Sequence, residues 1–440
     1  MRHHPLVFCA VAALATTGVS QSYAETVFSS GSFGGSQTVP SAYNNTASNT
    51  PVLTATNNSS SYQPQNNFQQ CLANLRGQAI SSGVSASTYD HYTRNLSPDY
   101  SVIDKLNFQP EFRTDIWDYL SALVDDERVR DGQAKIAEHR QVLERASRQY
   151  GVPVETIVAV WGVESNFGAI SGNYPLVQAL STLSCEGRRQ SYFRGEFFTT
   201  LKILQRGDLT EDQMKGSWAG AFGHTQFMPS TYDRLAVDFD GDGRRDLVSS
   251  IPDALASTAN FLKRANWQTG MPWGFEVRAD GVSASGRTNK SALSGWANRG
   301  VTRMDGSPLI QGNLSGSTPA ALIAPAGNNG PKFIVFRNFD ALYSYNAAES
   351  YALAIALLSD RLQGKSGVTG QWPTDDAGTS RAERREIQQL LLNRGHDIGA
   401  VDGLIGDHTR QAIRIEQQRL GLNTDGRAGQ KILNALRQGR

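Results

Sequence analysis

The stretch Val154–Gly168 constrains the fold more than any other part of this 440-residue chain. The residues just before Glu164 are apolar for about two helical turns, and Ile157, Trp161 and Glu164 are spaced at i, i+4 and i+7. This spacing places the three side chains on one face of a helix. The sequence therefore predicts a buried helix that carries a carboxylate on its apolar face, near its C-terminal end.

A carboxylate in such a setting has two interpretations. Apolar surroundings raise the pKa of an acid, and a raised pKa suits a general acid that works near neutral pH. Alternatively, a structural ion pair with Arg188 or Arg189 neutralises the charge, because ion-pair networks also place acids in apolar settings. The spacing alone favours neither interpretation.

Three further segments combine aromatic rings with polar side chains. Residues 188–193 hold two arginines beside two aromatic rings, residues 216–230 mix small residues, rings and amides, and residues 345–351 add tyrosines and an asparagine. Guanidinium groups beside rings suit anionic or carbohydrate ligands, whereas a solvated helix face is the structural alternative for the first segment. Together the three segments indicate a groove that binds sugars.

The length and composition indicate more than one domain. The chain is 39% hydrophobic and 19% charged, and its formal charge of +1 argues against a nucleic-acid partner. Helical periodicity runs from Cys71 to about residue 363, interrupted near residues 278–335 by a stretch rich in Gly, Ser, Asn and Pro. We expect a mainly α (α+β) domain over residues 71–363, with a small strand-containing insertion.

No apolar run in the sequence reaches the roughly 18 to 20 residues that a membrane span needs, and the longest one lies at the N-terminus. Residues 1–24 show the basic start, short apolar stretch and small residues of a cleaved signal peptide. Residues 25–70 contain 30 Ser, Thr, Asn, Gln or Gly among 46, which predicts a disordered low-complexity linker. We therefore expect an exported, periplasmic protein with no integral membrane segment after signal removal.

Two cysteines, Cys71 and Cys185, remain once the signal peptide is removed. An even number of cysteines in an oxidising compartment favours a disulfide over redox catalysis. Two buried free thiols are the alternative.

The C-terminal part reads as a separate unit. Residues 364–380 form a second linker rich in Gly, Ser, Thr and Asp, which we expect to be flexible. Within residues 381–440, the pattern that begins at Asp402-Gly403 recurs 23 residues later at Asp425-Gly426. Each half resembles a glycine turn followed by an apolar-faced helix, and an earlier helix completes a three-helix unit.

The motifs over about residues 70 to 362 resemble the membrane-bound lytic transglycosylase B family, lysozyme-like enzymes that cleave the glycan of peptidoglycan. The resemblance rests on Gly162-Val163-Glu164-Ser165, the arginine pair, residues 216–230 and the three residues from Tyr345 onward, in the family's order. It implies that Glu164 is the single catalytic acid and base. The residues that it implies for substrate binding are Arg188, Arg189, Ser217, Gln226, Phe227, Tyr345, Asn346 and Tyr351. Phe261 stands where some members have a tyrosine.

The C-terminal unit resembles a small peptidoglycan-binding domain through residues 401–406 and 409–413. A binding unit of this kind raises the effective concentration of an enzyme at an insoluble polymer. The expected partner is therefore the glycan strand of peptidoglycan, and the sequence does not identify protein partners.

The resemblance implies a reaction without water. A hydrolase usually needs two carboxylates that flank the bond, and this sequence offers one acid in a convincing apolar setting. Glu164 would protonate the glycosidic oxygen and then help the 6-hydroxyl of N-acetylmuramic acid to attack C1, which leaves a 1,6-anhydro end. The alternatives are a hydrolytic muramidase on the same fold and an inactive wall-binding scaffold. No cofactor is expected for catalysis.

Residues 238–246 resemble the first half of an EF-hand calcium loop, with oxygen ligands at alternate positions and a glycine at the sixth. Ser249 replaces the usual glutamate at the twelfth position. The sequence predicts a weak structural calcium site, with an acidic surface turn as the alternative. Its expected ligands are Asp238, Asp240, Asp242, the backbone carbonyl of Arg244, Asp246 and Asp253.

Overall fold

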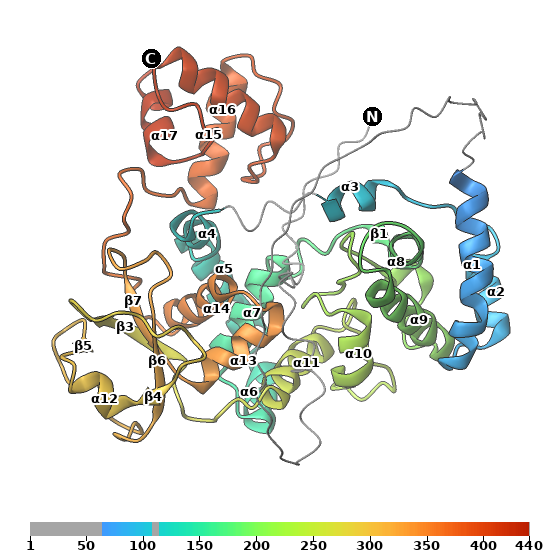
Figure 1. The fold of residues 1–440 in the computed structure, drawn as a ribbon, viewed down its shortest axis with the longest axis horizontal. Helices are drawn as coiled ribbons and strands as arrows, with labels where there is room; N and C mark the ends of the chain where they lie inside the picture. Colours follow the sequence, from blue (N-terminus) through green and yellow to red (C-terminus); the bar gives the residue numbers. More distant parts are fainter. Residues whose placement is uncertain (1–63, 108–113, 440) are drawn as a thin grey trace, which may run out of the picture.

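The computed structural model describes residues 64–107 and 114–439 (Figure 1). The expected signal peptide (1–24) and most of the expected first linker (25–63) lie outside the described residues. The described part is mainly helical with one small sheet, which confirms the predicted fold class. Within it, no helix is both long enough and apolar enough to span a bilayer.

One group of helices forms a lobe with its own apolar core, seen to the right in Figure 1. Its helices are α1 (Pro64–Ser81), α2 (Ala86–Thr93), α3 (Ser101–Asn107), α8 (Leu176–Cys185), α9 (Gln190–Arg206) and α10 (Pro229–Leu235). The short strands β1 (Tyr174–Pro175) and β2 (Lys215–Gly216) pair beside it. A disulfide between Cys71 and Cys185 joins α1 to α8, with the two Cα atoms 5.9 Å apart.

Helix α1 begins at Pro64, so residues 64–70 do not belong to the linker that their composition predicts. Phe68 and Leu72, one helical turn apart, are both buried in the core of this lobe. Two apolar residues on one face are enough to pack a helix against a neighbour. An average over a polar segment does not reveal such a pair.

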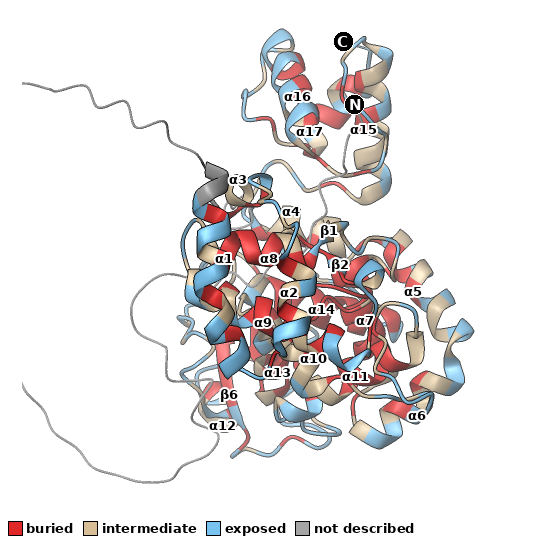
Figure 2. Cartoon of the chain, turned by 90° about the vertical axis from the view of Figure 1, so that its right-hand side faces the viewer, coloured by how far each residue is buried: buried red, intermediate tan, exposed pale blue. Residues whose placement is uncertain are grey.

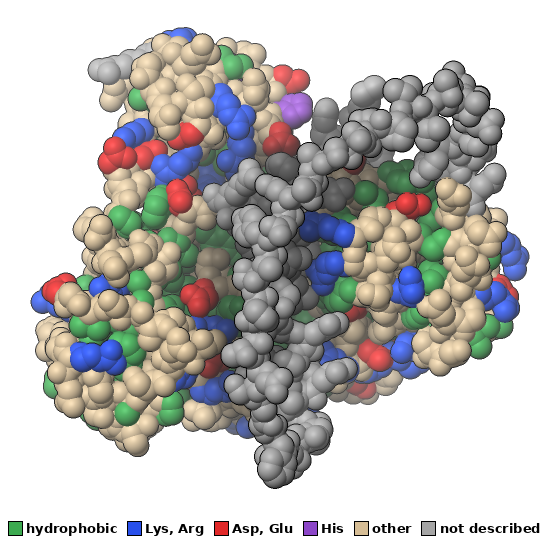
Figure 3. Space-filling model, in the orientation of Figure 1, with side chains coloured by type: hydrophobic (Ala, Val, Ile, Leu, Met, Phe, Trp, Pro, Cys, Tyr) green, Lys and Arg blue, Asp and Glu red, His purple; other side chains and the backbone are tan. Residues whose placement is uncertain are grey.

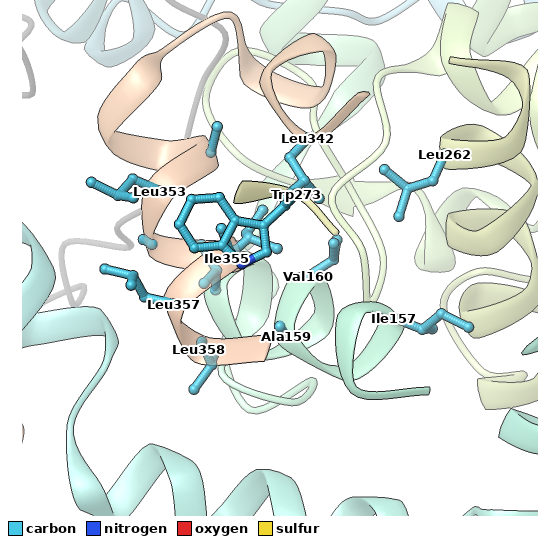
Figure 4. Packing of buried hydrophobic residues seen from close by; sticks show 14 of the residues in the cluster. Ile157, Ala159, Val160, Leu262, Trp273, Leu342, Leu353, Ile355, Leu357 and Leu358 are labelled. Atoms are coloured by element: carbon cyan, nitrogen blue, oxygen red, sulfur yellow. The ribbon is translucent and has the colours of Figure 1, made fainter. Parts of the chain in front are cut away.

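A second group of helices surrounds α7 (Val154–Ser165), the helix that the sequence predicts to be buried. Figure 4 shows its residues Ile157, Ala159 and Val160 among side chains from the neighbouring helices, and Figure 2 shows α7 and α14 buried. The surrounding helices are α4 (Ile116–Leu123), α5 (Asp126–Glu138), α6 (Arg140–Tyr150), α11 (Ile251–Arg264), α13 (Arg337–Asn346) and α14 (Glu349–Leu362).

The expected strands form an antiparallel sheet of order β4-β6-β7-β3-β5. Phe333 and Val335 of β7 contact the core around α7, whereas Ile334 faces a separate core that includes Trp296. This alternation is the period of a strand covered on both faces. The strands are β3 (Gly274–Arg278), β4 (Ser291–Ala292), β5 (Thr302–Arg303), β6 (Pro319–Ile323) and β7 (Lys332–Val335), and α12 (Leu293–Ala297) covers one face.

The C-terminal unit consists of α15 (Arg381–Asn393), α16 (Asp407–Arg419) and α17 (Gln430–Arg437) around a small core of its own. Residues 364–380 contain no helix or strand, yet they are not the free tether that their composition predicts. The carboxylate of Glu276 accepts hydrogen bonds from the backbone of Thr369 and Gly370, each at 2.8 Å, and Trp372 packs against the core around α7. The segment is therefore a strap that follows the surface of the larger domain.

Ion pairs join the C-terminal unit to α4 and α5. Arg427 contacts both carboxylate oxygens of Asp118, at 2.5 and 2.7 Å. Arg381 contacts Asp125 at 3.1 Å and Asp131 at 3.0 Å. Figure 3 shows basic and acidic side chains together on the side of the unit that faces the larger domain. The two parts therefore meet through complementary charges.

Candidate active site

Glu164 lies one residue before the end of α7, where the chain turns sharply. Asn166 and Phe167 follow with φ values of 49° and 59°, a left-handed conformation that ends the helix. The ring of Phe167 folds back onto Gly162, where a Cβ would lie 2.8 Å from it, so this position requires glycine. The turn keeps the Glu164 side chain buried, with 3% of its surface exposed.

Within the described part of the chain, the carboxyl group of Glu164 has one hydrogen-bond partner. Its Oε1 accepts a hydrogen bond from the hydroxyl of Tyr351 on α14, and its Oε2 is buried with no partner. Burial raises the pKa of Glu164 to about 8, although the Tyr351 hydrogen bond acts in the opposite direction. Glu164 makes no ion pair with any residue that the structure describes, so the predicted alternative of a structural pair with Arg188 or Arg189 is wrong.

Two tyrosines form the wall behind Glu164. The rings of Tyr345 and Tyr351 stack with their centroids 6.2 Å apart, and the Tyr345 hydroxyl donates to the carbonyl of Thr225 at 2.7 Å. Burial, and next the proximity of Glu164, raise the pKa of both hydroxyls well above the usual value. Both groups therefore remain hydrogen-bond donors at neutral pH.

The segment 216–230 lies beside this wall, but most of its predicted binding residues are engaged within the fold. The Ser217 hydroxyl accepts from the backbone N–H of Ala221 at 3.0 Å, and the Gln226 amide donates to the carbonyls of Ser171 and Gly223. Phe227 is 1% exposed and packs against the ring of Tyr345. These residues shape the loop.

Phe261 and Asn346, which the sequence also singles out, differ in whether they keep a polar atom for a ligand. Phe261 contacts the rings of Phe227 and Tyr345, so an apolar ring completes the cluster where some family members have a tyrosine. Asn346 is buried with its Oδ1 unpaired, so it retains a polar atom for a ligand.

The arginine pair lies at the junction of α8 and α9. Arg188 donates to the carbonyl of Leu106 on α3, and the Arg189 guanidinium lies over the Tyr192 ring, 4.5 Å from its centroid. Neither arginine lines the cleft at Glu164. In this structure both of them contact neighbouring residues of the first lobe.

An open cleft of about 360 Å³ reaches Glu164 from the side of the C-terminal unit. The larger domain contributes residues from α4, α5 and the end of α7, and the C-terminal unit contributes the opposite wall. Sequence reasoning missed this second wall, since nothing local in either sequence segment indicates that they meet. The wall includes Arg381, Arg384, Leu404, Arg410 and Arg427.

The acidic loop after α10 brings together only part of the predicted calcium ligands. Carboxylate oxygens of Asp238, Asp240 and Asp253 lie within 4.8 Å of one another. Asp242 and Asp246 are not members of this group. Asp242 instead accepts a hydrogen bond from the backbone N–H of Arg244 at 2.8 Å, because the short side chain caps its own turn.

Asp246 also has other partners. Its carboxylate oxygens accept from the Gln213 side chain at 2.9 Å and from the backbone N–H groups of Val248 and Ser249, each at 2.8 Å. These hydrogen bonds orient the carboxylate toward the following turn.

The helical fold, with one buried and protonated acid at the end of an open cleft, is that of a lysozyme-like glycan-cleaving enzyme. Residues 67–360 match the family model described as transglycosylase SLT domain, and the chain belongs to this family. Residues 380–436 match a second model, described as putative peptidoglycan binding domain.

Three relatives place the chain more closely. It is 34% identical over 242 residues to membrane-bound lytic murein transglycosylase B of Escherichia coli (strain K12), a match that covers 54% of this chain and 64% of the relative. The chain is also similar to SltB3 from Pseudomonas aeruginosa, whose structure was solved in complex with NAG-anhNAM-pentapeptide. The two are 44% identical with a TM-score of 0.67, and the match covers 84% of this chain and 99% of SltB3. The Escherichia coli lytic transglycosylase Slt35, solved in complex with calcium, is 29% identical with a TM-score of 0.58. This match covers 68% of this chain and 93% of Slt35.

Proposed function

We propose that this protein is a lytic transglycosylase that cleaves the β-1,4 bond between N-acetylmuramic acid and N-acetylglucosamine in peptidoglycan. The observation that carries the proposal is the single carboxyl group of Glu164, which is buried at the cleft and whose pKa is raised to about 8. Such a group is protonated at neutral pH and can act as a general acid. The family supports the substrate class.

In the first step, Glu164 gives its proton to the glycosidic oxygen, and the bond from that oxygen to C1 of the muramic acid breaks. The unpaired Oε2 is the oxygen suited to this transfer, because Tyr351 already occupies Oε1. The substrate's own acetamido group stabilises C1. The Tyr351 hydroxyl stabilises the resulting carboxylate.

In the second step, the Glu164 carboxylate takes the proton of the 6-hydroxyl while O6 attacks C1. The product carries a 1,6-anhydro ring, and no water is consumed. Among the other acids at the cleft wall, Asp118 is paired with Arg427 and Asp425 accepts from the Gln417 side chain at 2.7 Å, whereas Asp115 is exposed to solvent. A hydrolase would need a second carboxylate free to position water.

The C-terminal unit fits a role in holding the enzyme on insoluble glycan, and export fits the sequence of residues 1–24. The disulfide between Cys71 and Cys185 supports an oxidising compartment, the periplasm or cell envelope.

A structural calcium ion is the second part of the proposal. Asp238, Asp240 and Asp253 offer hard oxygen ligands close enough to share one ion, which suits calcium better than zinc. Asp253 also accepts backbone hydrogen bonds from Phe239 at 2.7 Å and from Asp246 at 2.8 Å, so it already orders the loop around the site. The ion would stabilise this loop and takes no part in proton transfer.

Digestion of purified peptidoglycan followed by mass spectrometry of the fragments tests the reaction. Anhydro ends and hydrated ends differ by one water. We expect anhydro ends from the wild type and far fewer from Glu164→Gln in the same time. Hydrated reducing ends would show a hydrolytic muramidase, and no fragments at all would show an inactive wall-binding protein.

A further inference from the structure

Three of the arginines that line the cleft at Glu164 have no acidic partner. Arg128 of α5, Arg384 of α15 and Arg410 of α16 all face this cleft. Among residues 64–107 and 114–439, no carboxylate lies within ion-pair distance of their guanidinium groups. The other two lining arginines, Arg381 and Arg427, are paired with aspartates of the larger domain.

Arg128 is buried, and Arg384 is half-buried. Arg128 is 5% exposed, and it donates to the backbone carbonyl of Gly162, while its Nε is buried without a partner. Arg384 donates to the carbonyl of Asp118 at 3.1 Å, and its Nε is likewise buried and unpaired. Burial lowers the pKa of both groups to about 10, so both still carry a charge at neutral pH.

A buried cation without an anion is costly, and a guanidinium group offers a planar pair of donors that matches a carboxylate. The acids of the cleft do not meet this need. Asp118 is held by Arg427, Asp425 by Gln417, Asp115 is exposed, and Glu164 is protonated at neutral pH. Asp125, Asp131 and Glu127 lie close enough to Arg128 to favour its charged form, but none of them is within ion-pair distance. The guanidinium groups therefore keep donors for an anion from outside the chain.

The proposed substrate carries such an anion close to the reacting bond. Each muramic acid of peptidoglycan bears a stem peptide on its lactyl group, and this peptide has free carboxylates. A muramic acid whose glycosidic bond reaches Glu164 also brings its stem peptide to the end of α7, because the peptide and the bond belong to the same sugar. This is where the cleft opens between the larger domain and the C-terminal unit.

We propose that the cleft is a subsite for stem-peptide carboxylates, formed by Arg384 and Arg410 of the C-terminal unit opposite Arg128. The inference rests on the proposed function and names the group of the substrate that these arginines would bind, a carboxylate of the stem peptide. The C-terminal unit is then part of the substrate site, in addition to any binding to the wall elsewhere on its surface.

The test compares two substrates, which are peptide-bearing glycan chains and the same chains stripped by an amidase. The quantity measured is the ratio of kcat/KM for the first substrate to kcat/KM for the second. For Arg384→Gln and Arg410→Gln we expect this ratio to fall by roughly 10- to 100-fold, the usual effect of losing one hydrogen bond to a charged group. The matched control is Arg437→Gln, since Arg437 pairs with Glu386 on the same unit and does not line the cleft.

Arg410→Gln separates recognition from domain packing, because the Arg410 side chain makes no ion pair or hydrogen bond to the described part of the chain. A ratio equal to that of the wild type in both variants would overturn the proposal. So would a loss of the same size on both substrates, which would assign the arginines a purely structural role. Failure of the wild type to make anhydro ends from either substrate would instead refute the proposed function.

Discussion

Burial of Glu164 places opposite demands on activity and on stability. The protonated acid is the form that the first chemical step needs, and desolvation maintains it up to a pH of about 8. Ionisation at higher pH leaves a buried charge whose only hydrogen-bond partner among the described residues is Tyr351. Both effects can be measured with the same nearly isosteric substitution.

For activity, Glu164→Gln removes the transferable proton and keeps the shape of the side chain. We expect turnover of peptidoglycan to fall by about 100- to 10,000-fold, the usual contribution of general acid catalysis. The control is Glu155→Gln in the first turn of the same helix. A folded Glu164→Gln protein that turns over at the wild-type rate would remove Glu164 from the mechanism.

For stability, the raised pKa means that the folded state holds a proton that the unfolded state has released. The free energy of unfolding then falls as the pH rises from the ordinary value of 4.5 through about 8. Glu164→Gln cannot ionise, so its melting temperature should exceed that of the wild type increasingly over this range. Melting curves between pH 5 and about 9 check this expectation, and a difference independent of pH would contradict it.

Tyr351→Phe tests the hydrogen bond to Glu164. This bond stabilises the carboxylate, so its removal should raise the pKa of Glu164 further. We expect the alkaline limb of the pH profile of kcat/KM to move to higher pH, together with a lower maximal rate. Tyr150→Phe, whose hydroxyl contacts Gln149, serves as the control. An unmoved limb would show that this bond does not tune the acid.

The position of Glu164 could be predicted, but its partner could not be derived from the sequence pattern. The spacing of Ile157, Trp161 and Glu164 locates the acid on one helix, since helical periodicity is a local property. Tyr351 lies 187 residues later on another helix. No periodicity links two such positions, so only the resemblance to a family brought Tyr351 into the predicted site.

At the scale of elements, local patterns predicted the type of most segments and misplaced some of their limits. Helix α7 has a long apolar run and is found where expected, and β4 to β7 lie within the predicted stretch 278–335, whereas β3 lies at its start, over Gly274–Arg278. The start of α1 was missed, because Phe68 stands among polar residues. In the acidic loop, the alternation of aspartates predicted more ligands than the backbone brings together, because Asp242 and Asp246 cap turns instead.

The loop of residues 238–253 gives a prediction at this scale. Millimolar calcium should raise the melting temperature of the protein, because an ion that binds only the folded state stabilises it. Asp240→Asn should reduce this rise, since Asp240 belongs to the group of three carboxylates. Asp242→Asn is the matched control and should keep the rise. A melting temperature indifferent to calcium would contradict the site.

At the scale of the whole molecule, the strap and the ion pairs decide where the protein can be divided. Composition alone suggests a cut after residue 364, but Trp372 packs against the larger domain and Glu276 binds the strap. A cut that removes residues 379–440 keeps these contacts. It leaves Asp118 and Asp125 without their arginine partners.

We expect this truncated protein to bind intact sacculi about 100-fold more weakly than the full-length protein, because one of two linked binding sites is lost. Its melting temperature should also fall, since acids of the interface lose their partners. Co-sedimentation with sacculi measures the first effect, with Arg437→Gln in the full chain as the control. Equal sedimentation of both lengths would refute a binding role for the C-terminal unit.

The charged interface also limits how such a gene can recombine. A crossover within the codons for residues 364–380 would join the α4 and α5 of one parent to the arginines of another. Asp118, Asp125 and Glu127 would then face an unmatched surface, although both halves fold around separate cores. The hybrid would inherit two intact domains and a cleft with the wrong charges, so a sound chimera has to exchange α4 and α5 together with the C-terminal unit.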